Sequence, residues 1–122
     1  MRNLVCIVIL LTRLNCIAQF NLVPNASFET YSACPTGGSQ YFKCTNWLAP
    51  TNNDVDYFNT CGIGTYSVPL KNRVALLNAR TGGAFMGFIP FNGFVGLNYR
   101  EYLQAQLNLT MQNNKCYLVS FY

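Results

Sequence analysis

Histidine is absent from this chain of 122 residues, and acidic residues are few: four Asp and Glu stand against eight Lys and Arg. Without His, neither a Ser-His-Asp triad nor a Cys-His pair can be assembled within the chain. A glycosidase would need two carboxyl groups facing each other, and the acids available are Glu29, Asp54, Asp56 and Glu101. We expect Asp54 and Asp56 to lie solvated in a polar loop, and Glu101 to form a surface or cross-strand ion pair. The inventory therefore predicts that the chain is not an enzyme.

Two further classes of site lack the residues that they need. No two cysteines stand two to four positions apart, and with no His a zinc ligand set is incomplete. The basic residues after position 18 are scattered, whereas nucleic-acid binders usually carry a basic patch or stripe. These residues are Lys43, Lys71, Arg73, Arg80, Arg100 and Lys115. We therefore expect neither zinc nor a nucleic-acid partner.

Long apolar runs are missing as well. The apolar run of residues 4–12 is interrupted by Arg13, well short of the roughly 20 apolar residues that a membrane-spanning helix needs. Arg2 precedes the run and the small residues of Cys16-Ile17-Ala18 follow it, which is the organisation of a secretory signal peptide. Lipidation of Cys16 is disfavoured, because Arg13 occupies the position that usually holds Leu in lipoprotein signals.

We therefore divide the chain into a signal peptide, residues 1–18, and a mature module, residues 19–122. Loss of two basic residues, Arg2 and Arg13, lowers the formal net charge from +4 to +2. The prediction is a secreted protein, extracellular or associated with the outer membrane, whose mature chain has no transmembrane segment.

All the aromatic residues of the chain lie in the mature module, at position 20 or later. The module also holds many Gly, Pro, Asn and Thr residues, and this composition favours short strands and turns. The clearest alternation runs through residues 101–109, where one face holds Leu103, Ala105, Leu107 and Leu109. We predict that this strand forms a hairpin with residues 116–122, whose Tyr117, Val119 and Phe121 share a face. Weaker strand candidates are residues 28–31, 41–43, 74–77 and 84–89.

Several separated segments resemble a known family. Residues 21–29 place an apolar pair before a Pro24-Asn25 turn and an aromatic followed by a carboxylate after it. The other segments are Cys34-Pro35, Trp47 with Pro50, Asp56-Tyr57-Phe58-Asn59 with Cys61, Val68-Pro69, residues 82–87 and residues 99–103. In this order and spacing they resemble the N-terminal galactose-binding-like module of long surface proteins from Gram-negative gliding bacteria.

The resemblance implies an all-β fold, a β-sandwich of the jelly-roll, galactose-binding-like type. Such modules typically precede OmpA-type domains or gliding-motility-type C-terminal sorting domains. A jelly roll has eight strands in two sheets, and the module offers about six strand candidates. We therefore expect residues 19–122 to be the N-terminal part of a sandwich that is incomplete at its C-terminus, with the terminal strand of a finished domain as the alternative.

Four cysteines remain in the mature module: Cys34, Cys44, Cys61 and Cys116. Export places them where disulfides form, and four cysteines allow three connectivities. Because Cys34 and Cys61 belong to the family pattern, the resemblance implies a bond between them. A bond between Cys44 and Cys116 is the remaining expectation.

The function that we predict is binding of a glycan or of a surface protein by a module of a larger cell-surface or envelope protein. Trp47, Asp56, Tyr57 and Asn59 offer the aromatic, amide and carboxylate groups that β-sandwich modules use for sugars, although such aromatics also serve as half-buried core residues. The resemblance further implies calcium at Glu29, with other ligands from a late acidic stretch that this chain lacks. The alternatives are a purely structural spacer and, less favoured, a glycoside hydrolase fragment.

Export is expected to remove residues 1–18 and to leave Gln19 at the N-terminus, because the small residues that signal peptidase reads end at Ala18. Intact-mass and N-terminal peptide analysis of the exported protein measure this directly. A mature protein that begins at a lipidated Cys16 would contradict the prediction.

Overall fold

A computed structural model describes residues 20–51, 54–68, 70–71, 76–93 and 99–122. The described elements are two single-turn 3-10 helices and four short strands: η1 (Tyr41–Lys43), β1 (Asp56–Asn59), η2 (Gly64–Tyr66), β2 (Leu70–Lys71), β3 (Leu76–Leu77) and β4 (Ala84–Gly87). The strands form two separate two-stranded sheets, β1 with β4 and β2 with β3. The chain is therefore a small, mainly β domain with little helix, which agrees with the predicted fold class at this level.

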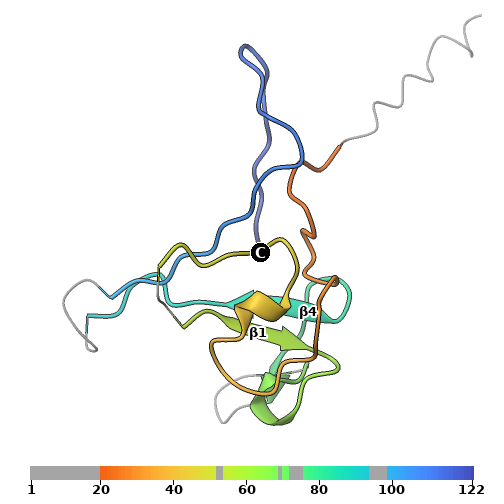
Figure 1. Cartoon of the computed structure of the whole chain (residues 1–122), viewed down its shortest axis with the longest axis vertical. Helices are drawn as coiled ribbons and strands as arrows, with labels where there is room; N and C mark the ends of the chain where they lie inside the picture. Colours follow the sequence, from red (N-terminus) through yellow and green to blue (C-terminus); the bar gives the residue numbers. More distant parts are fainter. Residues whose placement is uncertain (1–19, 52–53, 69, 72–75, 94–98) are drawn as a thin grey trace, which may run out of the picture.

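Strands β1 and β4 pair antiparallel at the centre of the domain (Figure 1). In their register Phe58 lies opposite Phe85, and the two rings stack with centroids 4.7 Å apart. Three consecutive residues of β1 are buried, from Tyr57 to Asn59. A strand that is buried on both faces shows no alternation of polar and apolar residues, which explains why the sequence predicted a polar loop around Asp56 instead.

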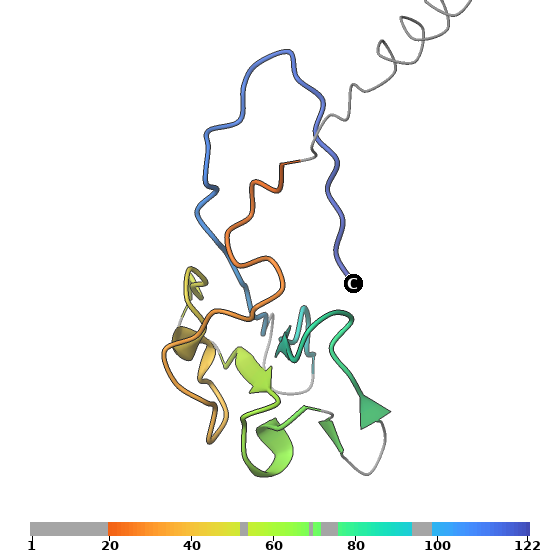
Figure 2. The same ribbon diagram turned by 90° about the vertical axis from the view of Figure 1, so that its right-hand side faces the viewer.

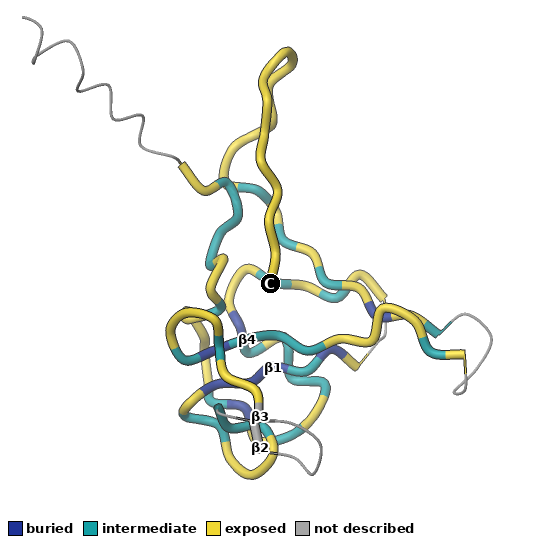
Figure 3. Tube along the Cα trace, turned by 180° about the vertical axis from the view of Figure 1, so that it is seen from behind, coloured by how far each residue is buried: buried dark blue, intermediate teal, exposed yellow. Residues whose placement is uncertain are grey.

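The main cluster of core residues lies on the Tyr57 face of this sheet. Cys44, Tyr57 and Ala84 are its buried members, and the half-buried residues Phe28, Trp47 and Met86 pack against them. The rings of Phe28 and Trp47 lie with centroids 4.9 Å apart. Figure 3 shows that the buried residues gather around β1 and β4, whereas the segments that extend away from the sheet are exposed.

The predicted turn at Pro24-Asn25 forms. Asn25 has a φ of 47°, in the left-handed region that Asn tolerates, and the turn closes through a bond of 3.0 Å from the Phe28 N–H to the Asn25 carbonyl oxygen. The Asn25 amide nitrogen donates to the carbonyl oxygens of Thr30 and Thr45, at 2.8 Å each. The turn is thereby fastened to the segment that follows η1.

The predicted disulfide between Cys34 and Cys61 is confirmed. Their Cα atoms lie 5.5 Å apart across 27 positions of sequence. The expected bond between Cys44 and Cys116 is wrong, because both thiols are free. Cys44 is enclosed in the core beside the Asn25 amide, whereas Cys116 is exposed on the C-terminal segment.

The weaker strand candidates have mixed outcomes. Within residues 84–89, β4 forms over Ala84–Gly87, and within residues 74–77, β3 covers Leu76–Leu77 while residues 74–75 lie outside the described part. In residues 28–31 only Tyr31 pairs, through a bridge to Cys44. The strand expected at residues 41–43 is wrong, since this segment is the helix η1.

The predicted hairpin of residues 101–109 and 116–122 does not form. Exposure alternates along residues 102–108 as the sequence indicates, with Leu103, Ala105 and Leu107 half-buried and the residues between them exposed. The backbone of residues 101–109, however, joins other described segments through a bond from the Glu101 N–H to Ile89, a bridge between Gln104 and Leu48, and a bond from the Asn108 N–H to Leu22. Residues 101–109 start beside the sheet, where Glu101 bonds to Ile89, and then run away from it (Figure 2).

Removal of the disulfide by Cys34→Ser together with Cys61→Ser is expected to lower the free energy of unfolding by about 3 to 4 kcal/mol, because the bond closes a loop of this length in the unfolded chain. Urea denaturation of the exported protein measures the change. Cys116→Ser is the control, and we expect it to leave the stability within about 0.5 kcal/mol of the unchanged protein. Equal stability of the double variant and the control would contradict a structural role for the bond.

Candidate functional site

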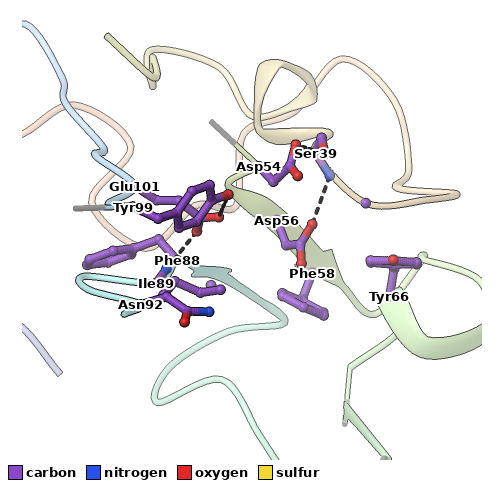
Figure 4. A pocket seen from close by; sticks show the side chains of 12 residues that line it. Ser39, Asp54, Asp56, Phe58, Tyr66, Phe88, Ile89, Asn92, Tyr99 and Glu101 are labelled. Atoms are coloured by element: carbon purple, nitrogen blue, oxygen red, sulfur yellow. Dashed lines mark hydrogen bonds between the residues drawn. The ribbon is translucent and has the colours of Figure 1, made fainter. Parts of the chain in front are cut away.

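A pocket of about 590 Å³ opens beside β1 and the residues that follow β4. Three of the four acidic residues of the chain line it: Asp54, Asp56 and Glu101. Aromatic rings form other parts of its wall, namely Phe58, Tyr66, Phe88 and Tyr99. We call this site the Asp56 pocket, and Figure 4 shows its side chains.

Ser39 joins the two aspartates of the pocket. Its backbone N–H donates to Asp56 Oδ1 and its hydroxyl donates to Asp54 Oδ1, each at 2.8 Å (Figure 4). Asp54 is exposed, as expected, but Asp56 is half-buried at the start of β1 rather than solvated in a loop. Burial raises the pKa of Asp56, the charges of Glu101 and Asp54 raise it further, and the Ser39 N–H opposes the shift.

Glu101 is not the surface ion-pair residue that the sequence predicted. Its side chain is only 4% exposed, and its carboxylate accepts bonds from the Ile89 N–H at 2.6 Å and from the Tyr99 hydroxyl at 2.8 Å. The bond to Glu101 is the main reason that the pKa of Tyr99 is raised, because the carboxylate favours the protonated phenol. The neighbouring guanidinium of Arg100 lies over the ring of Phe91, 5.1 Å from its centroid.

Of the four predicted ligand residues, Asp56 alone lines the Asp56 pocket, and the other three bond within the chain. The indole N–H of Trp47 donates to the Asn25 carbonyl oxygen at 3.0 Å. Tyr57 is 0% exposed; its hydroxyl donates to the Phe28 carbonyl oxygen at 2.9 Å and accepts from the Asn59 amide at 2.7 Å. Burial raises the pKa of Tyr57 to about 12. These contacts favour a role in the core for Trp47, Tyr57 and Asn59.

Glu29 fastens the turn before β4. Its Oε1 accepts bonds from the N–H groups of Gly83 and Ala84, at 2.9 and 3.0 Å. Gly82 has a φ of 67°, and a Cβ at this position would collide with the Glu29 carboxylate. In the described part of the chain, no three His, Cys, Asp or Glu residues are grouped so that they could hold a metal ion. Calcium at Glu29 stays a prediction.

Sequence reasoning missed most of the pocket. Ser39, Tyr66, Phe88 and Asn92 line it, yet none of them stands in a pattern that indicates a site. Tyr99 and Glu101 do lie in one of the segments that carry the family resemblance, and their position there is the signal that could have pointed to this wall.

Comparison of the chain with protein-family models, with curated proteins and with solved structures gives no match. In the described residues no helix has the length and apolar character to cross a membrane. The disulfide between Cys34 and Cys61 is compatible with an extracellular location.

Replacement of Trp47 by Ala is expected to lower the free energy of unfolding by about 3 kcal/mol, the lower end of the range for a buried Trp, because the indole is half-buried against Phe28. Chemical denaturation measures the change. Phe42→Ala is the control, since Phe42 is 64% exposed and we expect its loss to cost less than about 0.5 kcal/mol. If Trp47→Ala kept full stability but abolished glycan binding, Trp47 would be a ligand contact instead of a core residue.

Proposed function

We propose that the chain is a non-catalytic extracellular module of a larger cell-surface or envelope protein, and that it binds a glycan or a surface protein through the Asp56 pocket. The proposal combines the predicted signal peptide and the family resemblance with the composition of this pocket. In this proposal the mainly β domain is the N-terminal part of a galactose-binding-like β-sandwich.

The observation that carries the proposal is the combination of carboxylates and aromatic rings in one pocket. Ionised carboxylates accept hydrogen bonds from hydroxyl groups, which sugars display in number. Aromatic faces carry partial negative charge and pack against C–H groups, which form the apolar faces of a sugar ring. Asp54 and Asp56 supply the first kind of group, and the rings of Tyr66, Phe88 and Tyr99 supply the second.

Glycoside hydrolysis is the second candidate, because three carboxylates line the same pocket. Two contacts favour binding over hydrolysis. Both carboxylate oxygens of Glu101 already accept bonds from Ile89 and Tyr99, and the residue is only 4% exposed, which places it poorly for an acid or base role on a ligand. Asp54 and Asp56 are bridged by Ser39, whereas the two acids of a glycosidase flank the scissile bond from opposite sides.

A purely structural spacer is the remaining alternative. A spacer needs no pocket with charged walls. Burial raises the pKa of Asp56 and the neighbouring carboxylates of Glu101 and Asp54 raise it further, and this grouping of acids in one pocket favours a ligand-binding site over a spacer.

Asp56→Asn is expected to weaken binding to the glycans recognised by the unchanged protein on a glycan array by about tenfold or more, which is the effect of losing a charged hydrogen bond. Gly38→Ala should also weaken binding, because its Cβ would lie 3.1 Å from the Tyr66 hydroxyl and 3.2 Å from Asp56 Oδ1. Gly37→Ala is the matched control, since its Cβ would meet only the Gln40 side chain.

Retention of full binding by both Asp56→Asn and Gly38→Ala would place the ligand elsewhere. Absence of binding to glycans and to extracted surface proteins alike would favour the spacer. Release of sugar from an array glycan by the unchanged protein, abolished in Asp56→Asn, would reject the non-catalytic assignment in favour of the hydrolase.

A further inference from the structure

We infer that Glu101 is the positioning residue of the Asp56 pocket: it holds Tyr99 and the backbone at Ile89 in place as one wall and does not itself contact the ligand. The inference rests on the proposed function, because it assigns a role within that binding site. It also divides the three carboxylates of the pocket into one that builds the wall and two that face the ligand.

Glu101 makes three short hydrogen bonds to two positions of the wall. Its Oε2 accepts from the Ile89 N–H at 2.6 Å, and its own backbone N–H donates to the Ile89 carbonyl oxygen at 2.9 Å. Its Oε1 accepts from the Tyr99 hydroxyl at 2.8 Å (Figure 4). Both carboxylate oxygens are therefore engaged by the chain, and only 4% of the side chain is exposed.

These bonds join two segments of the chain, since Ile89 and Glu101 are 12 positions apart in the sequence. Ile89 lies in the segment that leaves β4, and Tyr99 lies two residues before Glu101. The same two segments meet again where the Asn92 N–H donates to the Tyr99 carbonyl oxygen at 3.0 Å. Because Ile89, Asn92 and Tyr99 all line the pocket, the shape of this wall depends on the bonds that Glu101 makes.

Both carboxylate oxygens of Glu101 accept hydrogen bonds from donors of the chain itself, so these bonds do not require a ligand. Asp54 and Asp56 differ from Glu101, because Ser39 engages one oxygen of each and both residues are more exposed than Glu101. The ligand-facing acids are therefore the two aspartates.

Tyr99 provides a direct readout of the Glu101 carboxylate. The groups that raise the pKa of Tyr99 are first the bond to Glu101, then burial, then the charges of Glu101 and Asp54. Loss of the Glu101 charge should consequently move this pKa down, and loss of the Asp54 charge should move it down by less. A residue that merely filled space would not affect the titration.

The experiment compares Glu101→Gln, which keeps the shape of the side chain, with the unchanged exported protein by NMR. We expect the pKa of Tyr99 to fall toward the ordinary tyrosine value of about 10. We also expect the Ile89 amide hydrogen to exchange about tenfold faster or more, as for a lost charged hydrogen bond. Tyr99→Phe identifies the Tyr99 signal among the eight tyrosines, and it should leave the Ile89 amide protected.

Asp54→Asn is the charge-matched control, because it removes the same unit of charge from the same pocket. A Tyr99 pKa that moves as far in Asp54→Asn as in Glu101→Gln would overturn the inference, and so would an Ile89 amide that exchanges at the unchanged rate in Glu101→Gln. If Glu101→Gln does not fold, Tyr99→Phe decides: a change in the carboxyl signal of Glu101 supports the bond, and an unchanged signal overturns it.

A further titration separates this inference from the proposed function. Galactose, N-acetylglucosamine, glucosamine and cellobiose are added to the labelled protein while the carboxyl signals are followed. A larger response of Asp56 than of Glu101 supports the division of roles, and a larger response of Glu101 overturns it. If no array glycan or sugar binds, the glycan function fails, while the Tyr99 titration and the Ile89 exchange still decide the role of Glu101.

Discussion

The hydroxyl group of Tyr57 holds the N-terminal turn on the central sheet. It donates to the Phe28 carbonyl oxygen and accepts from the Asn59 amide, so that both hydrogen-bonding capacities of a fully buried phenol are used inside the chain. The Asn59 Oδ1 in turn accepts from the Cys61 N–H at 3.0 Å, next to the disulfide. Loss of the Tyr57 hydroxyl would leave Asn59 without this partner in the core, where an unsatisfied polar group is costly.

Glu29 extends this arrangement to the second strand of the sheet. It lies directly after Phe28, and its carboxylate accepts hydrogen bonds from the N–H groups of Gly83 and Ala84, at the start of β4. One short segment of sequence therefore fixes β1 through Tyr57 and β4 through Glu29. The pocket depends on both, because Asp56 begins β1 and the Ile89 wall continues from the end of β4. This dependence explains why the turn at Pro24-Asn25 matters to a site that it does not touch.

The sequence predicted features that short-range chemistry determines. A few neighbouring residues determine three of these features: the left-handed backbone of Asn25, the alternating exposure of residues 102–108 and the strand after Gly83. The disulfide was predicted from the family pattern, which carries information about distant residues. Phe28 is a counter-example, because its φ of 64° is unusual for an aromatic residue and is maintained by the closing bond to Asn25 and by contact with Trp47.

Pairing between distant segments could not be predicted in the same way. Alternation in residues 101–109 indicates which side chains turn inward, but a strand also requires a neighbour for its backbone groups, and alternation does not say which segment that neighbour is. The pocket presents the same difficulty. Ser39 and Asp56 are 17 positions apart and Ile89 and Glu101 are 12 apart, and nothing local to either pair indicates that they meet.

The four acids of the chain form two pairs with different contacts. Glu29 and Glu101 accept backbone N–H groups from distant segments, which a carboxylate does better than a neutral side chain because charged hydrogen bonds are the stronger ones. Asp54 and Asp56 instead share Ser39 at the pocket, where the shorter side chains leave the carboxylates close to the backbone and to one another. In the proposed site, a structural role for Glu101 leaves Asp54 and Asp56 as the carboxylates that face a ligand. Because Ser39 bonds to both of them, they do not flank a bond from opposite sides as the two acids of a glycosidase do.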